Sequence, residues 1–250
     1  MSIWGKILGG AAGMALGGPL GALIGAVAGH FAVDQKNDGP KSDGDPSHRD
    51  DEDVTRQIGF TIGVIALGAK MAKADGVVTP DEIAAFRRVF RTAPDEEENV
   101  ARLFNQAKRD VAGFESYAAQ LARMLRDSPL VLEQVLDCLF VIATADGKVT
   151  ADEMVFLRRV AEIFGIDTGE FARIREIHLG QDESDPFTIL GVKHDTPLDE
   201  IRARHRQLVR ENHPDMLMAQ GLPQEAIDVA TEKLARINAA WDQVRKLREA

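Results

Sequence analysis

Cysteine is almost absent from this 250-residue sequence, which has a single copy at Cys138. One cysteine excludes an intramolecular disulfide and any metal centre that needs several thiolates. Its neighbours are apolar, among them Leu136 and Leu139. We therefore expect a buried, unreactive thiol, which fits a reducing compartment.

Aromatic residues are also scarce, at 6% of the chain, although 44% of all residues are hydrophobic. Alanine, leucine and valine supply most of the apolar content, and this composition suits helices more than sheets. Apolar residues recur at spacings of three and four, and no segment shows a convincing strand pattern. The sequence predicts an all-α fold.

An excess of positive charge is missing as well, because the formal net charge is -10. Such a balance argues against a nucleic-acid binder. The common enzyme patterns are also missing: there is no Ser/His/Asp set, no phosphate-binding loop and no Cys/His cluster. We expect a protein that is not an enzyme and has no cofactor.

Charge of either sign is absent from residues 7–29. As one helix this segment would be about 35 Å long, which is enough to cross a hydrocarbon core of about 30 Å. We therefore expect a transmembrane helix within an anchor over residues 1–33. A signal peptide is the alternative, because Lys6 precedes the apolar run and residues 26–28 (AVA) resemble a cleavage site.

Glycine recurs at every fourth residue of this segment. Such a stripe leaves one helix face without side chains, so that a second helix can approach closely, and it predicts a homodimer contact within the bilayer. The alternative is that glycine is simply abundant here. The stripe consists of Gly9, Gly13, Gly17, Gly21, Gly25 and Gly29.

Residues 34–53 are polar, contain glycine and proline, and lack apolar periodicity, which predicts a flexible linker. Lysine and arginine are more frequent after the apolar segment than before it. This bias favours a cytoplasmic location for the rest of the chain.

An internal repeat marks residues 54–180, where we expect a helical bundle. The segments 72–82 (AKADGVVTPDE) and 143–153 (ATADGKVTADE) match each other. In each copy Asp-Gly makes a turn, and a threonine with a glutamate three residues later forms a capping box. The repeat resembles the TerB-like helical domain of tellurite-resistance proteins.

The same two turns contain the acidic residues Asp75, Glu82, Asp146 and Glu153. Their spacing matches part of an EF-hand loop, but the first and third positions of that loop lack carboxylates, which excludes an EF-hand. Two interpretations stay open: the residues cap helices, or they form an acidic metal site where the loops meet.

The C-terminal part, residues 184–250, shows four features in a fixed order. A short helix over DPFTILGV is followed by a basic helix, by a loop with His213-Pro214-Asp215, and by a long helix opened by Pro223. Apolar residues of the long helix predict an antiparallel seam with the basic helix. These seam residues are Ile227, Ala230, Leu234, Ile237, Trp241 and Val244.

The basic helix is expected to be capped by Thr196 and carries Arg202, Arg206 and Arg210 at a spacing of four. This arrangement resembles the J domain of the DnaJ family. The resemblance implies that the arginines and the tripeptide His213-Pro214-Asp215 bind an ATP-driven chaperone of the DnaK class and stimulate its ATPase.

Two positions depart from the J-domain pattern. His205 stands where the family usually has tyrosine, and Gln207 where it usually has lysine. We expect His205 to be a packing residue, so these departures concern affinity for the partner more than the fold.

The order of glycine-rich anchor, TerB-like bundle and J domain resembles DjlA-type proteins. That resemblance implies a co-chaperone with a single span in the bacterial inner membrane and with its J domain in the cytoplasm, where the partner finds ATP. Two other functions stay open: a metal- or stress-sensing bundle with the J domain as adaptor, and a structural membrane assembler driven by the glycine stripe.

Overall fold

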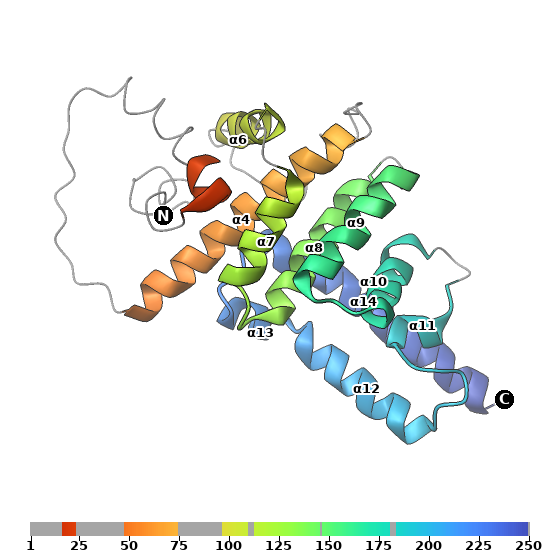
Figure 1. Cartoon of the computed structure of the whole chain (residues 1–250). Coiled ribbons are helices and arrows are strands. Elements are labelled where there is room, and N and C mark those ends of the chain that lie inside the picture. The colour runs from red at the N-terminus through yellow and green to blue at the C-terminus, as the bar shows by residue number, and fades with distance from the viewer. Residues whose placement is uncertain are drawn as a thin grey trace, which may run out of the picture.

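The computed structural model describes residues 17–23, 48–74, 97–109, 113–145, 147–180 and 184–249. Every longer element within these ranges is a helix, which confirms the all-α prediction. We call α4 and α6–α10 the bundle and α11–α14 the C-terminal module (Figure 1). The helices are α4 (His48–Ala74), α6 (Glu97–Arg109), α7 (Phe114–Met124), α8 (Pro129–Ala143), α9 (Ala151–Phe164), α10 (Thr168–Leu179), α11 (Pro186–Leu190), α12 (Leu198–Glu211), α13 (Pro214–Ala219) and α14 (Gln224–Glu249).

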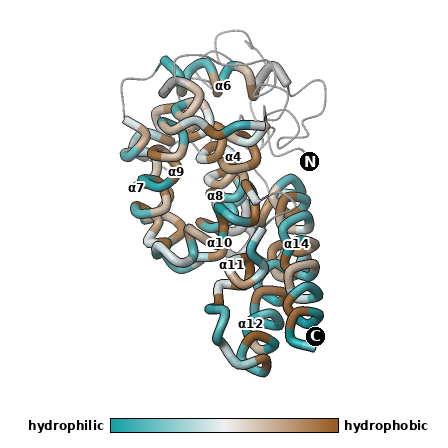
Figure 2. The backbone as a smooth tube through the Cα atoms, turned by 90° about the vertical axis from the view of Figure 1, so that its right-hand side faces the viewer, coloured by the Kyte–Doolittle hydropathy of each residue, from teal (hydrophilic) through white to brown (hydrophobic). Residues whose placement is uncertain are grey.

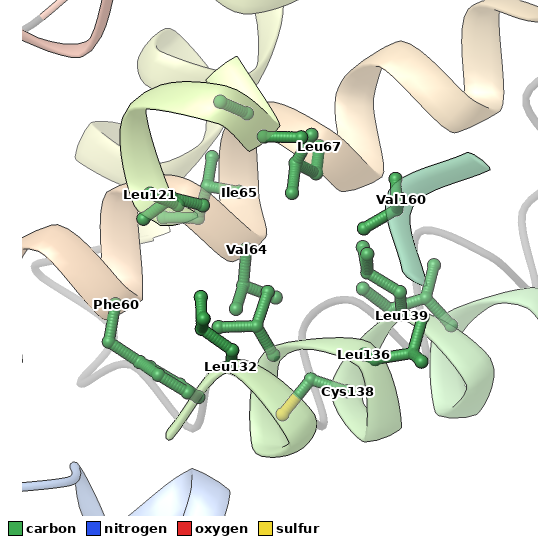
Figure 3. Packing of buried hydrophobic residues seen from close by; sticks show 14 of the residues in the cluster. Phe60, Val64, Ile65, Leu67, Leu121, Leu132, Leu136, Cys138, Leu139 and Val160 are labelled. Atoms are coloured by element: carbon green, nitrogen blue, oxygen red, sulfur yellow. The ribbon is translucent and has the colours of Figure 1, made fainter. Parts of the chain in front are cut away.

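Helix α4 is the centre of the bundle. All of its residues from Ile58 to Ala72 are buried, as expected of a helix that is apolar on every side. Helices α6, α7, α8 and α9 surround it. Figure 3 shows Ile65 of α4 beside Leu121 of α7, and Val64 of α4 beside Leu132 of α8.

Cys138 lies in the same core without exposed surface. Burial raises the pKa of its thiol well above the usual range, because a thiolate would lose its hydration there. The prediction of a buried thiol is confirmed.

Helix α4 begins at His48, so the last residues of the segment expected as a linker, 48–53, are helical. Extending an existing helix fixes one residue per additional hydrogen bond and is far easier than starting one. A polar sequence can therefore continue a helix whose later turns are held by packing, although it has no apolar period of its own.

A short piece of the glycine-rich segment packs against the bundle. Residues 18–23 form a helical turn, in which Leu20 and Leu23 are buried in the bundle core. The Leu20 amide donates to Gln120 Oε1 over 3.0 Å, and Gln120 Nε2 donates to the Gly17 carbonyl over 2.8 Å. Gln120 thus closes this turn from helix α7.

The expected uninterrupted helix over residues 7–29 is broken in this structure. Gly17 and Gly18 have φ angles of 51° and 58°, whereas a right-handed helix needs about -63°. Within the described ranges, none of the helices combines the length and the apolar character that a bilayer span requires. Of the glycine stripe, Gly9, Gly13, Gly25 and Gly29 lie outside the described residues.

The C-terminal module contains the antiparallel pair predicted from its sequence. Ile201 and Leu208 of α12 are buried together with Ile237 and Val244 of α14, which confirms the later part of the predicted seam. The prediction was wrong for Ile227 and Ala230, which pack into the bundle core. Ile177 of α10 belongs to the same apolar cluster. Figure 2 shows α12 and α14 side by side, with α14 continuing up to the bundle.

Helix α14 contributes to both cores of the molecule. Its later turns belong to the cluster with α12, whereas Ile227 and Ala230 of its first turns are buried in the bundle core. Leu217 of α13 and Leu222, which follows α13, lie in the bundle core as well. The chain ranges 54–180 and 184–250, expected as separate domains, therefore share their apolar cores.

Candidate functional site

The basic stripe of α12 is exposed. Arg202, Arg206 and Arg210 all face solvent, because residues four apart share one helix face. Arg202 Nη1 lies 3.5 Å from Asp199 Oδ1. Arg206 and Arg210 form no ion pair with any residue of the described ranges, so their charges are available to an external partner.

The start of α12 differs from the sequence expectation. Pro197 occupies the N-cap position, so the prediction that Thr196 caps this helix was wrong. Its hydroxyl accepts a hydrogen bond from the Lys193 amide over 3.1 Å and closes the preceding turn. Asp199 and Glu200 occupy the first turn, where carboxylates interact favourably with the helix dipole.

The tripeptide begins a short helix. The segment after α12 was expected as a loop, but α13 starts at Pro214, and His213 is its N-cap. Proline suits the first helical position because its missing N–H would have no partner there. The His213 ring accepts a hydrogen bond through Nδ1 from the Asp215 amide, over 3.2 Å. A proline after a capping side chain thus makes the helical turn that periodicity did not reveal.

The outer groups of the tripeptide are free to meet a partner. The side chain of Asp215 is 81% exposed and that of His213 is 49% exposed. Because Nδ1 of His213 accepts from a backbone amide, a neutral ring has its proton on Nε2. The turn therefore presents one hydrogen-bond donor beside a carboxylate, while Pro214 restricts the backbone between them.

Behind the tripeptide, the end of α12 is fixed by Asn212. This residue is buried, and its Nδ2 donates to the Leu208 carbonyl over 2.9 Å. The same carbonyl also accepts the Asn212 backbone amide over 3.0 Å, so this residue closes the last turn of α12 with two hydrogen bonds. It also sets the direction in which the chain leaves α12 toward His213.

His205 packs between the two long helices of the module, as expected. Its ring stacks on Trp241 with centroids 5.2 Å apart, and its Nε2 lies 2.9 Å from Asn238 Oδ1. Gln207 donates to Glu211 over 2.8 Å along α12. The two departures from the J-domain pattern thus leave the seam closed and the arginine stripe unchanged.

A buried ion network joins the bundle to the C-terminal module. The Lys233 side chain is only 1% exposed and forms ion pairs with Glu133 and, over 2.7 Å, with Asp137 of α8. His178 Nε2 of α10 lies 2.8 Å from the second oxygen of Asp137. Sequence analysis did not identify this group. The available signal was a lysine on the apolar face of α14, between Ala230 and Ile237.

The network continues to the basic helix α12. Arg173 of α10 bonds to Glu133 over 2.5 Å and to Glu170 over 2.6 Å. Glu170 in turn pairs with Arg204 of α12 over 2.5 Å. Charged side chains therefore connect the interior of the bundle to the helix that carries the arginine stripe.

Protonation states in this network follow from burial and pairing. Burial alone would raise the pKa of Asp137, but Lys233 and the hydrogen bond from His178 hold it well below its usual range. The pKa of Glu133 is also lowered: burial opposes this, and Lys233 and Arg173 outweigh it. Both carboxylates are therefore ionised at neutral pH.

The second repeat turn forms a capping box. The Thr150 hydroxyl accepts from the Glu153 amide, and the Glu153 carboxylate accepts from the Thr150 amide over 2.8 Å. This confirms the predicted cap for α9. The first turn with Asp75 and Glu82, as well as Asp146, lies outside the described residues, and the described ranges hold no metal-binding group of three His, Cys, Asp or Glu side chains.

Two family models match parts of the chain. The model described as tellurite resistance protein TerB matches residues 61–176, which covers most of the bundle. The model described as the co-chaperone DjlA transmembrane domain matches residues 1–43. No solved structure matches the chain.

Curated relatives align with nearly the whole chain. Co-chaperone protein DjlA of Coxiella burnetii is 29% identical over 264 residues, which cover 98% of this chain and 97% of the relative. Co-chaperone protein DjlA of Photobacterium profundum is 28% identical over 273 residues, or 98% of each chain. The chain is thus similar to DjlA co-chaperones over nearly its whole length and to TerB over most of the bundle. The two full-length alignments extend over the C-terminal module, which lies beyond both family models.

Proposed function

We propose that this protein is a co-chaperone that binds a DnaK-type chaperone through the C-terminal module and stimulates its ATPase. The observation that carries the proposal is the exposed tripeptide at the start of α13, directly after a helix with an exposed arginine stripe. The protein itself is not an enzyme. It acts by changing the nucleotide state of its partner.

Each part of the site has its own role in this proposal. The arginine stripe attracts an acidic surface of the chaperone and raises the rate of encounter. Asp215 then pairs with a cation of the partner, and His213 donates a hydrogen bond through Nε2. Pro214 keeps the two side chains at a fixed separation.

We also propose that residues 1–33 anchor the protein in the bacterial inner membrane, with the bundle and the C-terminal module in the cytoplasm. In the membrane, residues 17–23 would leave the bundle core and become part of the span. The uncharged segment and the match to the DjlA transmembrane domain support this location. The glycine stripe offers a contact for a second copy of the anchor. A cytoplasmic module is required because the chaperone uses ATP.

The test is steady-state ATP hydrolysis by a DnaK-type chaperone in the presence of the full chain in detergent micelles. The full chain is used because it contains the proposed anchor together with the bundle and the C-terminal module. Wild type is expected to stimulate hydrolysis, and His213→Gln is expected to return the rate to that of the chaperone alone.

His194→Gln is the matched control, because His194 is also an exposed histidine of the module, with a side chain 73% exposed. It lies in the connection between α11 and α12 and should keep full stimulation. Stimulation that persists in His213→Gln would refute the assigned role of the tripeptide. No stimulation by wild type would refute the co-chaperone proposal.

A further inference from the structure

The turn that carries the tripeptide is held by the bundle as well as by its own module. Leu217 in α13 is 1% exposed and Leu222 after α13 is 5% exposed, and both lie in the apolar cluster formed by the bundle. The first turns of α14 add Ile227 and Ala230 to that cluster. The middle of the short helix α13 and the segment that follows it are therefore fixed by residues whose packing partners include the bundle.

The first half of α14 is held against α8 by charge. Lys233 enters between Glu133 and Asp137; the side chains of Lys233 and Asp137 are fully buried, and that of Glu133 is 17% exposed. A buried ammonium needs such partners, since an unpaired charge in this position is strongly unfavourable. The ion pairs fix where α14 lies along α8, and α13 packs against α14.

We propose that the TerB-like bundle positions the His213-Pro214-Asp215 turn, with Lys233 as the positioning residue that locks α14 and α13 onto α8. This inference rests on the proposed function, because it concerns the same tripeptide. It gives the bundle a definite role, since α8 and its neighbours supply part of the packing that a free-standing J-type hairpin would have to provide for itself.

The geometry distinguishes this positioning role from docking by α12. Lys233 belongs to the part of α14 that packs on the bundle, whereas the arginine stripe faces solvent on α12. Loss of Lys233 leaves Asp137 with His178 and without its cation. The first turns of α14 and the turn after α12 then lose a fixed position, while Arg202, Arg206 and Arg210 keep their exposure.

The experiment compares Lys233→Met with wild type as full chains in detergent micelles. ATPase stimulation is measured over a range of co-chaperone concentrations, which separates the plateau from the half-maximal concentration. We expect the plateau to fall several-fold for Lys233→Met. Lys246→Met, which removes an exposed lysine from the same helix, should leave both quantities unchanged.

The same titration and a double variant distinguish a folding defect from a positioning defect. A variant that is merely less folded has a smaller active fraction, so its half-maximal concentration rises while its plateau stays as in wild type. The double variant Lys233→Met/Asp137→Asn removes one charge of each sign, keeps an acceptor for His178, and should recover most of the plateau.

Amide hydrogen exchange tests how firmly α13 is held when the partner chaperone is absent. The amides of Met216, Gln220 and Gly221 donate to backbone carbonyls within this turn and should exchange faster in Lys233→Met than in Lys246→Met. Unchanged exchange together with an unchanged plateau, or a change in half-maximal concentration alone, would overturn the inference. If wild type does not stimulate, the proposed function fails, and the exchange experiment still decides whether Lys233 positions the turn.

Discussion

Thr150 shows what a single side chain does at a repeat turn. Its hydroxyl and the Glu153 carboxylate satisfy two amides that would otherwise have no partner at the start of α9. Thr150→Ala removes one of these bonds and should lower the free energy of unfolding by about 1 kcal/mol. Urea denaturation of the full chain, followed by helical circular dichroism, measures this difference.

The control is Thr168→Ala, because Thr168 is an exposed threonine at the first position of α10 whose cap is supplied by Asp167. It should change the unfolding midpoint little. The same experiment with added calcium distinguishes a helix cap at this turn from a metal site. A calcium-dependent rise in stability that disappears in Glu153→Gln would contradict a purely structural cap.

Single residues also mark where sequence analysis succeeded and where it failed. The exposed arginines and the tripeptide were identified because their spacing and order are local features of the chain. Lys233 was not, because its partner Glu133 lies 100 residues away. A lysine on an apolar helix face indicates a buried partner but does not say which carboxylate of the chain supplies it.

At the scale of the helix, α12 combines a buried face with a charged one. Replacing Arg202, Arg206 and Arg210 together by glutamine should raise the half-maximal concentration for ATPase stimulation about tenfold at low salt. The plateau should be retained, since the tripeptide is intact. The difference from wild type should shrink as salt is added, because the attraction acts over distances that ions screen.

Arg158 and Arg159 provide the control, with two charges removed in place of three, because they are exposed arginines on α9 of the bundle. Their replacement by glutamine alters the net charge without touching α12 and should leave the half-maximal concentration close to that of wild type. An equal effect of both sets would mean that overall charge, and not the stripe, governs the encounter.

The long helices were predictable because apolar spacing persists over several turns in α12 and α14. Helix α13 was missed because one turn is too short for such a pattern, and its proline was assigned to a loop. The start of α4 was placed too late for a related reason. A polar stretch that continues a packed helix has no apolar period to reveal it.

For the whole molecule, the shared ion network predicts a dependence of stability on acid. The pKa values of Asp137 and Glu133 lie below their ordinary values of 3.8 and 4.5. The folded state therefore binds fewer protons than the unfolded state, and stability falls as the pH drops below about 4.5 toward the pKa values of the folded state. Above that range the contribution is complete.

Denaturation at a series of pH values measures this effect. Asp137→Asn should be less stable than wild type by about 3–5 kcal/mol at neutral pH, because Lys233 loses a buried partner. The gap should narrow in acid. A gap that stays constant from neutral pH down to acid would show that Asp137 gains no proton on unfolding.

The arrangement of the whole molecule was the least predictable level. The sequence indicates a bundle followed by a hairpin, and each set of helices is found. That α13 and the first half of α14 pack into the bundle core depends on contacts between distant parts of the chain. Leu217 and Leu222 look like ordinary residues of the segment between α12 and α14 until their partners are known.

Helix α14 contributes buried residues to both apolar cores. This restricts where residues can be inserted into or deleted from the chain. Each inserted residue rotates everything beyond it by about 100° and moves it by about 1.5 Å. One extra residue between Lys233 and Ile237 would therefore turn Ile237 and Val244 away from α12. The part of α14 before the insertion would still pack against α8. Insertions and deletions should accumulate in the connections between helices and be excluded from this stretch of α14.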